Sequence, residues 1–181
     1  MIIAIFDSSF AREIWQIRSS KEWHHALAST SQPRPSLTHV PIPPIHSTSV
    51  LCFTDAAWHA TSSRAGCGWI FISQQDEHLH QGTTTFENTS SSLVPEALTI
   101  RSALLNALEA GFTRICIKKN CQALVALINS KNHPKDLYRI YRDIEHLSLS
   151  FYRIAFSYVS RNLNSLADSL AKSALLLYQM I

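Results

Sequence analysis

From residue 50 onward, the chain is patterned as three consecutive strands followed by alternating helices and strands, an order that few folds share. The predicted strands are 50–58, 65–73, 77–86, 113–118 and 151–159, and the predicted helices are 92–110, 121–130, 134–149 and 163–178. Three strands in a meander pair antiparallel, whereas strand–helix alternation produces parallel neighbours. The pattern therefore predicts an α/β domain with a five-stranded mixed sheet and helices packed on it.

Glycines mark two of these elements. Gly66 and Gly68 lie in the second predicted strand, where missing side chains suit a close approach of another backbone, or a bulge. Gly111 follows the helix 92–110 directly and is expected to end it.

A proline-rich stretch separates this domain from the residues before it. Residues 29–49 contain five of the seven prolines and no acidic residue, so they are expected to form a linker. Ile14, Trp15, Ile17 and Trp23 are broadly helical in spacing, which predicts a weak helix over 1–28. The expected organisation is an extension over 1–49 and a domain over 50–181.

Composition excludes some classes of protein and leaves others open. Hydrophobic residues make up 46% of the chain and charged residues 16%, which is typical of a globular protein. No apolar run reaches membrane-spanning length, and no basic residue precedes the opening MIIAIF, so neither a membrane span nor a secretory signal is expected. The formal charge of +3 permits a nucleic-acid partner without requiring one.

Four cysteines lie scattered along the chain, without the spacing of a zinc site. We interpret them as reduced, mostly buried thiols of an intracellular protein. The basic residues are too dispersed for a nuclear signal, so nucleus and cytoplasm stay equally open.

Three acidic residues lie on faces that should point inward. Asp55 shares its strand face with Leu51 and Phe53, and Glu96 aligns with the apolar stripe of the helix 92–110. Asp168 aligns with apolar positions of the last helix. Because a buried carboxylate is costly without a cation, convergence on one Mg²⁺ site is the functional hypothesis. The alternatives are a strand-end cap for Asp55, a macrodipole role for Glu96 and a local ion pair for Asp168.

Five segments of the chain resemble, in order, the ribonuclease H-like domain (RNase H type 1) of plant retroelement-derived proteins associated with non-LTR reverse transcriptases. They are FTDAAW (53–58), SSRAGCGWIF (62–71), PEALTIRSALLNAL (95–108), NCQALVALIN (120–129) and YVSRNLNSLADSLAK (158–172). The resemblance implies a ribonuclease H-like fold with helices on both faces of the sheet. It also implies Mg²⁺-dependent endonucleolytic cleavage of the RNA strand of RNA–DNA hybrids.

The resemblance places the four catalytic positions of that family on Asp55, Glu96, Asn120 and Asp168. Asp55, Glu96 and Asp168 are the implied ligands of two Mg²⁺ ions, for which Mn²⁺ could substitute. Asn120 departs from the family's pattern, because an amide there removes one negative charge. One missing electrostatic element in such a site costs orders of magnitude in rate, so we expect weakened or absent hydrolysis.

The same resemblance implies that Arg161 and Asn164 lie near the site, with Asn164 a candidate for contact with a 2′-hydroxyl or a phosphate. Lys119 and its neighbour Lys118 end a strand beside the same site, where they could neutralise phosphates or form a solvated strand end. The leading hypothesis is thus a weakened hybrid ribonuclease, acting as a monomer without a membrane. The alternatives are a catalytically inactive module that binds nucleic acid or protein, and a retroelement remnant.

Overall fold

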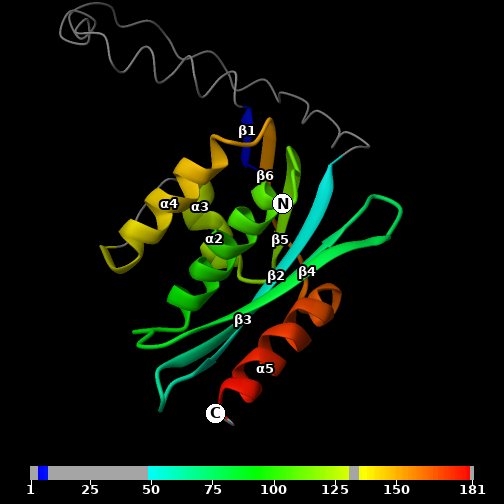
Figure 1. The fold of residues 1–181 in the computed structure, drawn as a ribbon. Helices are drawn as coiled ribbons and strands as arrows, with labels where there is room; N and C mark the ends of the chain where they lie inside the picture. The colour runs from blue at the N-terminus through cyan, green and yellow to red at the C-terminus, as the bar shows by residue number, and fades with distance from the viewer. Residues whose placement is uncertain (1–3, 8–48, 131–134, 180–181) are drawn as a thin grey trace, which may run out of the picture.

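The computed structural model describes residues 4–7, 49–130 and 135–179 (Figure 1). The strands are β1 (Ala4–Asp7), β2 (Val50–His59), β3 (Arg64–Ile72), β4 (His78–Phe86), β5 (Arg114–Lys119) and β6 (Arg153–Tyr158). The helices are α2 (Leu93–Glu109), α3 (Gln122–Ser130), α4 (Tyr138–Ser148) and α5 (Ser165–Gln179), with short 3-10 helices η2 (Lys135–Leu137) and η3 (Arg161–Asn164).

The strands form one sheet in the order β1-β6-β5-β2-β3-β4. β2, β3 and β4 pair antiparallel, whereas β2, β5 and β6 pair parallel. The predicted mixed sheet of five strands is therefore confirmed, with each strand within two residues of its expected ends.

A sixth strand comes from the residues assigned to the N-terminal extension. β1 pairs antiparallel with β6, with Ala4 opposite Phe156 and Asp7 opposite Arg153. The helix predicted over 1–28 is thus wrong for residues 4–7, and the rest of that prediction, like most of the linker 29–49, lies outside the described residues. An apolar run of branched and aromatic residues suits a strand as well as it suits a helix, and pairing with β6 decides between them.

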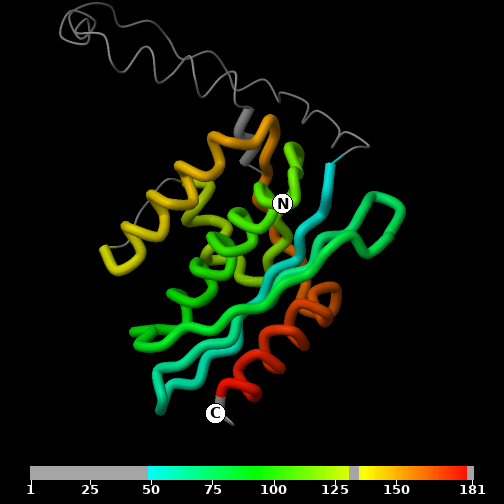
Figure 2. Tube along the Cα trace, viewed as in Figure 1, coloured from blue at the N-terminus to red at the C-terminus, as the bar shows by residue number. Residues whose placement is uncertain are grey.

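Helices cover both faces of the sheet, as expected (Figure 1). α5 packs on one face against β2 and β3, and α2 packs on the other face, with α4 behind it (Figures 1 and 2). Within the described part of the chain, no helix combines the length and the apolar character that crossing a membrane would need.

Two glycines of β3 allow α5 to approach the sheet. A Cβ at Gly68 would lie 2.6 Å from the backbone nitrogen of Ala171, and a Cβ at Gly66 would clash with the backbone of Ala171 and Leu175. The close approach predicted for these glycines is confirmed. On the opposite face of β3, the buried Trp69 donates a hydrogen bond from Nε1 to Oδ1 of Asn106 on α2, at 2.9 Å.

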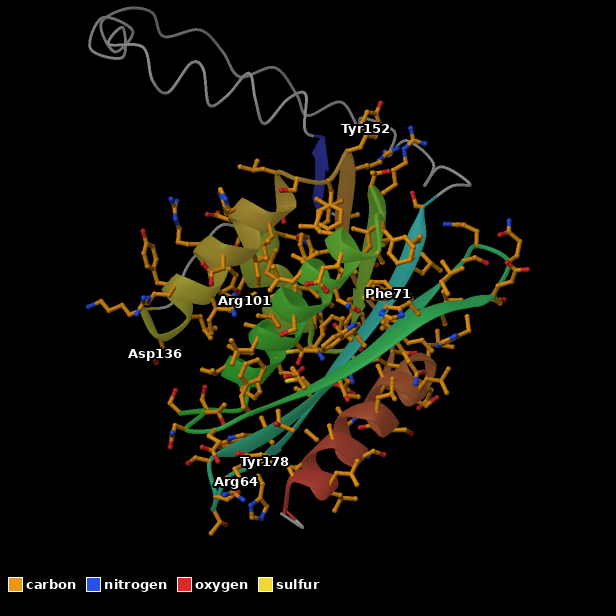
Figure 3. The ribbon with its side chains drawn as sticks, in the orientation of Figure 1. Arg64, Phe71, Arg101, Asp136, Tyr152 and Tyr178 are labelled. Atoms are coloured by element: carbon orange, nitrogen blue, oxygen red, sulfur yellow. The ribbon has the colours of Figure 1, made fainter. Side chains whose placement is uncertain are left out.

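The far end of α5 is tied to the sheet by polar contacts. Tyr178 donates a hydrogen bond to Glu87, and the guanidinium of Arg64 lies 5.0 Å from the centre of the Tyr178 ring, as Figure 3 shows near the C-terminus. α2 ends before Gly111, whose φ of +76° is the left-handed conformation expected of a helix-terminating glycine. All four cysteines are free, and three are buried, as predicted.

The strand order reverses between the neighbouring strands β2 and β5. From β2 the chain continues through β3 and β4 on one side, and from β5 it continues to β6 on the other. The residues that follow two parallel neighbouring strands at such a reversal lie close together at the carboxyl edge of the sheet. This is where α/β proteins bind their ligands. Thr54 lies opposite Lys119 in this register, so Asp55 and Asn120 are brought side by side.

Candidate functional site: an ion-pair cluster at the carboxyl edge of the sheet

The centre of the site is the ammonium group of Lys119, at the end of β5. Its side chain has no exposed surface, and its Nζ donates to the backbone oxygen of Thr54 and to Oδ1 of Asp55, both at 3.0 Å, and to Oδ1 of Asn120 at 3.1 Å. Glu96, in the first turn of α2, forms a further ion pair with the same nitrogen. Four oxygens from β2, α2 and the end of β5 therefore surround one cationic group.

Asp55 is held from several directions. It is 3% exposed, and its Oδ1 also accepts a hydrogen bond from its neighbour Ala56 at 3.0 Å. Its Oδ2 accepts a hydrogen bond from Nδ2 of Asn120 at 3.3 Å. The strand face that Asp55 shares with Leu51 and Phe53 is only half-buried at those two residues, although Asp55 itself is buried. An ionised carboxylate can stay in this position because the ammonium of Lys119 compensates its charge.

Glu96 lies in a less favourable environment than Asp55. Burial raises the pKa of its carboxyl group above the ordinary value of 4.5, and the nearby charge of Asp55 raises it further. The ammonium of Lys119 opposes both effects, as does the guanidinium of Arg161. The protonation of Glu96 thus depends on the cation that lies between the two carboxylates.

The structure places Asp168 differently from the other acidic residues. Its carboxylate is partly exposed, on the first turn of α5, and pairs with Nζ of Lys172 at 2.6 Å. The spacing of these two residues is that of a local pair on one helix, which is the alternative left open from the sequence. Asp55, Glu96 and Asn120 are brought together around Lys119, whereas the ion pair of Asp168 is with its own helix.

Of the three residues predicted to contact nucleic acid, Arg161 is exposed at the start of η3. Asn164 is 1% exposed, and its Nδ2 donates to the backbone oxygen of Thr54 at 3.0 Å. Lys119 is enclosed by the ion-pair cluster, so its ammonium offers no surface to a phosphate, and its predicted phosphate contact requires correction. Its position at the strand end was expected from the sequence, but the inward direction of its side chain was not.

Among residues 49–130 and 135–179, no other acid takes the place that Asn120 leaves. Asp143 on α4 pairs with Arg101 on α2 at 2.8 Å, and Glu109 is exposed at the end of α2. Asp136 is exposed in η2, and Figure 3 shows it beyond the end of α4. All three acids lie on elements other than the end of β5, where Asn120 lies.

The set of donors does not fit a pair of Mg²⁺ ions. Mg²⁺ binds through carboxylate oxygens and keeps several waters, with near-ideal octahedral geometry. Here, the charge of Asp55 and Glu96 is shared with an ammonium, and Asn120 is neutral and directs an amide nitrogen at Asp55. Across residues 4–7, 49–130 and 135–179, no three His, Cys, Asp or Glu side chains are grouped so that they could hold a metal ion.

Solved structures with the same fold include ribonucleases H. The chain is similar to RNase H1 from the archaeon Halobacterium salinarum, with 24% identity and a TM-score of 0.66 over 70% of this chain and 97% of that one. It is also similar to the N-terminal RNase H domain of a Mycobacterium tuberculosis protein, with 22% identity and a TM-score of 0.67 over 74% and 98%. The LC11 RNase H1, solved in complex with an RNA/DNA hybrid, has 18% identity and a TM-score of 0.67 over 72% and 99%. These likenesses show a ribonuclease H-like fold, as the sequence predicted.

A comparison with curated protein sequences found no match. Residues 53–174, more than half of the chain, match the family described as reverse transcriptase-like. This match spans the site from β2 to α5, including Asp55, Lys119 and Asn120. The chain therefore belongs to the reverse transcriptase-like family.

Proposed function

We propose that this chain is a nucleic-acid-binding domain that recognises RNA–DNA hybrids and does not cleave them. The ribonuclease H-like fold supports the substrate class, since a structure of this fold has been solved with an RNA/DNA hybrid bound. The proposal favours the non-catalytic alternative over the weakened hybrid ribonuclease.

The observation that carries the proposal is the ammonium of Lys119 between Asp55 and Glu96. Metal-assisted cleavage of a phosphodiester needs carboxylates that are free to hold cations next to the attacking and leaving oxygens. In this site both carboxylates are already paired with Lys119, and the third position is a neutral amide. The predicted pair of Mg²⁺ ions, or Mn²⁺ in their place, therefore has no matching set of ligands.

Binding of nucleic acid does not depend on that pair of ions. Hybrids are held largely through their phosphates and through 2′-hydroxyl groups, by exposed basic and polar side chains. Arg161 is exposed next to the ion-pair cluster, close enough to Glu96 to lower the pKa of its carboxyl group. We expect this binding to be independent of sequence, sensitive to salt and indifferent to chelators.

The test is a hybrid with a labelled RNA strand, incubated with the full chain in Mg²⁺, in Mn²⁺ and in EDTA. Cleavage is followed on a denaturing gel, and binding by fluorescence anisotropy on the same samples. We expect binding in all three conditions, including EDTA, and an intact RNA strand. Ionic strength is kept constant, and any weakening in Mg²⁺ or Mn²⁺ is that of competing counterions. The matched control is Asp55→Asn. RNA cleavage by the natural chain that is lost in this variant would show that the protein is a nuclease.

Other expectations from the sequence remain predictions. These are an origin in a plant retroelement, a monomeric state, an intracellular location and the alternatives of a protein-binding module or a retroelement remnant. Failure to bind hybrid in the test above, at low salt, would favour these last two alternatives over the proposed function.

A further inference from the structure

We infer that Lys119 is a built-in cation that keeps divalent ions out of this site, and that residue 119, rather than residue 120, decides whether a metal can bind. This inference deepens the proposed function, because it concerns the same site. It follows that Asn120→Asp, which restores the acidic residue of the family's pattern, is not sufficient by itself to restore binding of a divalent metal ion.

The first argument is the coordination of the ammonium group. Its oxygen partners come from the backbone of Thr54, from the side chains of Asp55 and Asn120 and from Glu96. The distances from Nζ to the oxygens of Thr54, Asp55 and Asn120 are 3.0, 3.0 and 3.1 Å, and the side chain has no exposed surface. An ammonium has three protons to donate, so these partners use its full capacity. The group occupies the oxygen-lined centre in which a metal ion bound by Asp55 and Glu96 would have to lie.

The second argument is electrostatic. A divalent ion bound to Asp55 would lie next to a fixed positive charge, with little water between them to screen the repulsion. To make room, the Lys119 ammonium would have to leave all of its oxygen partners. Displacement would therefore break several charge-assisted hydrogen bonds before the metal formed its first bond.

The third argument concerns Asn120 itself. Its Oδ1 accepts from Lys119 and its Nδ2 donates to Asp55, so the amide belongs to the ion-pair cluster. An aspartate in its place would add a carboxylate that the same ammonium can still pair with. The variant Asn120→Asp is thus expected to keep Lys119 in the centre of the site.

The experiment compares the natural chain, Asn120→Asp, Lys119→Ser and the double variant Lys119→Ser/Asn120→Asp. Binding of Mg²⁺ and Mn²⁺ is measured by isothermal titration calorimetry and by the Mn²⁺ paramagnetic resonance signal. Lys118→Ser is the matched control, because it removes one positive charge from the adjacent residue, whose Nζ contacts Ser157 instead of the acids. We expect Lys119→Ser and the double variant each to bind Mn²⁺ at least tenfold more tightly than the natural chain, Asn120→Asp and Lys118→Ser. If only the double variant gains binding, residue 119 alone does not decide it.

The inference is overturned if the natural chain or Asn120→Asp binds one Mn²⁺ as tightly as the double variant, and if Asp55→Asn abolishes that binding. Circular dichroism and thermal melting check that each variant folds. Should the serine variants unfold, Lys119→Met keeps the volume of the aliphatic stem and removes only the charge. With that variant, added Mn²⁺ should raise the melting temperature, and an unchanged melting temperature counts against the inference. None of these measurements uses an RNA–DNA hybrid. A failure of the metal-exclusion inference can therefore be distinguished from a failure of the proposed hybrid binding.

Discussion

Asn120 donates a hydrogen bond to Asp55 across the parallel strands β2 and β5, with 3.3 Å between Nδ2 and Oδ2. The same amide accepts a hydrogen bond from Lys119 through its oxygen, at 3.1 Å. A side chain with both a donor and an acceptor can satisfy an anion and a cation at once, which a carboxylate cannot do. The amide at residue 120 thus has a structural role in this chain.

Stability should therefore fall when Asn120 becomes aspartate. The variant Asn120→Asp replaces a hydrogen bond to a charged group by two facing carboxylates, which costs about 1–3 kcal/mol in the free energy of unfolding. Urea denaturation at pH 7 measures the difference. Gln122→Glu is the control, because it adds the same charge at an exposed position in the first turn of α3. Equal stability of the natural chain and Asn120→Asp would contradict this account of the amide.

Removal of the buried cation should make stability depend on pH. Breaking a buried ion pair typically costs about 3–5 kcal/mol, and Lys119→Met leaves Asp55 and Glu96 without the ammonium that lies between them. The pKa of Glu96 is already raised by burial and should rise further in this variant. A folded-state pKa above the unfolded value means that the folded state takes up a proton first, so its relative stability increases as pH falls.

The loss in free energy of unfolding of Lys119→Met, relative to the natural chain, should accordingly be largest near neutral pH. It should shrink as pH falls through the raised folded-state pKa of Glu96 towards the ordinary value of 4.5. Urea denaturation of both proteins over a series of pH values measures it. A deficit that widens on acidification would show that Glu96 does not respond to Lys119 in this way.

Packing of α5 on the sheet should be intolerant of any side chain at residue 68. Gly68→Ala places a Cβ 2.6 Å from the backbone nitrogen of Ala171, so the helix must move, and we expect a loss of about 3 kcal/mol. Gly111→Ala is the comparison: no atom crowds its Cβ, and only its φ of +76° is unfavourable, at about 1 kcal/mol. Thermal unfolding of the two variants gives the order, and a larger loss for Gly111→Ala would contradict the packing argument.

Hybrid binding should depend on Arg161 more than on other exposed arginines. If Arg161 contacts a phosphate, Arg161→Ala should weaken binding and lower the slope of log affinity against log salt by about one. Arg142→Ala is the control, because Arg142 is well exposed on α4, on the side of the sheet opposite α5. Anisotropy titrations over a range of KCl concentrations measure both variants. Equal slopes for the natural chain and Arg161→Ala would place the hybrid elsewhere on the domain.

The elements of the fold were predictable because their local signals agree with their tertiary environment. In the apolar stripe predicted for α2, Ala97, Ile100 and Leu104 are fully buried and Leu108 is partly buried. The glycines of β3 lie where α5 comes closest. Asp55 and Glu96 were recognised because carboxylates on apolar faces need a partner, and the structure gives both of them one.

The nature of that partner was not predictable from the pattern of acids alone. A carboxylate on a core face requires a cation, but whether the cation is a metal ion or a lysine depends on where Lys119 points at the end of β5. One signal was present: Asn120, which lacks the expected negative charge, directly follows a residue with a positive one. The ion pair of Asp168 with Lys172 was predictable as well, because opposite charges four residues apart on one helix lie next to each other.

The strand β1 affects the choice of the first residue for any fragment of this domain. Its backbone completes the hydrogen bonding of β6, although most of the chain between them belongs to other elements or lies outside the described residues. A fragment starting at residue 50 would therefore present the outer side of β6 as a bare edge, with amide and carbonyl groups open to any extended chain. In such a fragment, self-association through that edge would reflect the choice of its first residue and not a property of the intact protein.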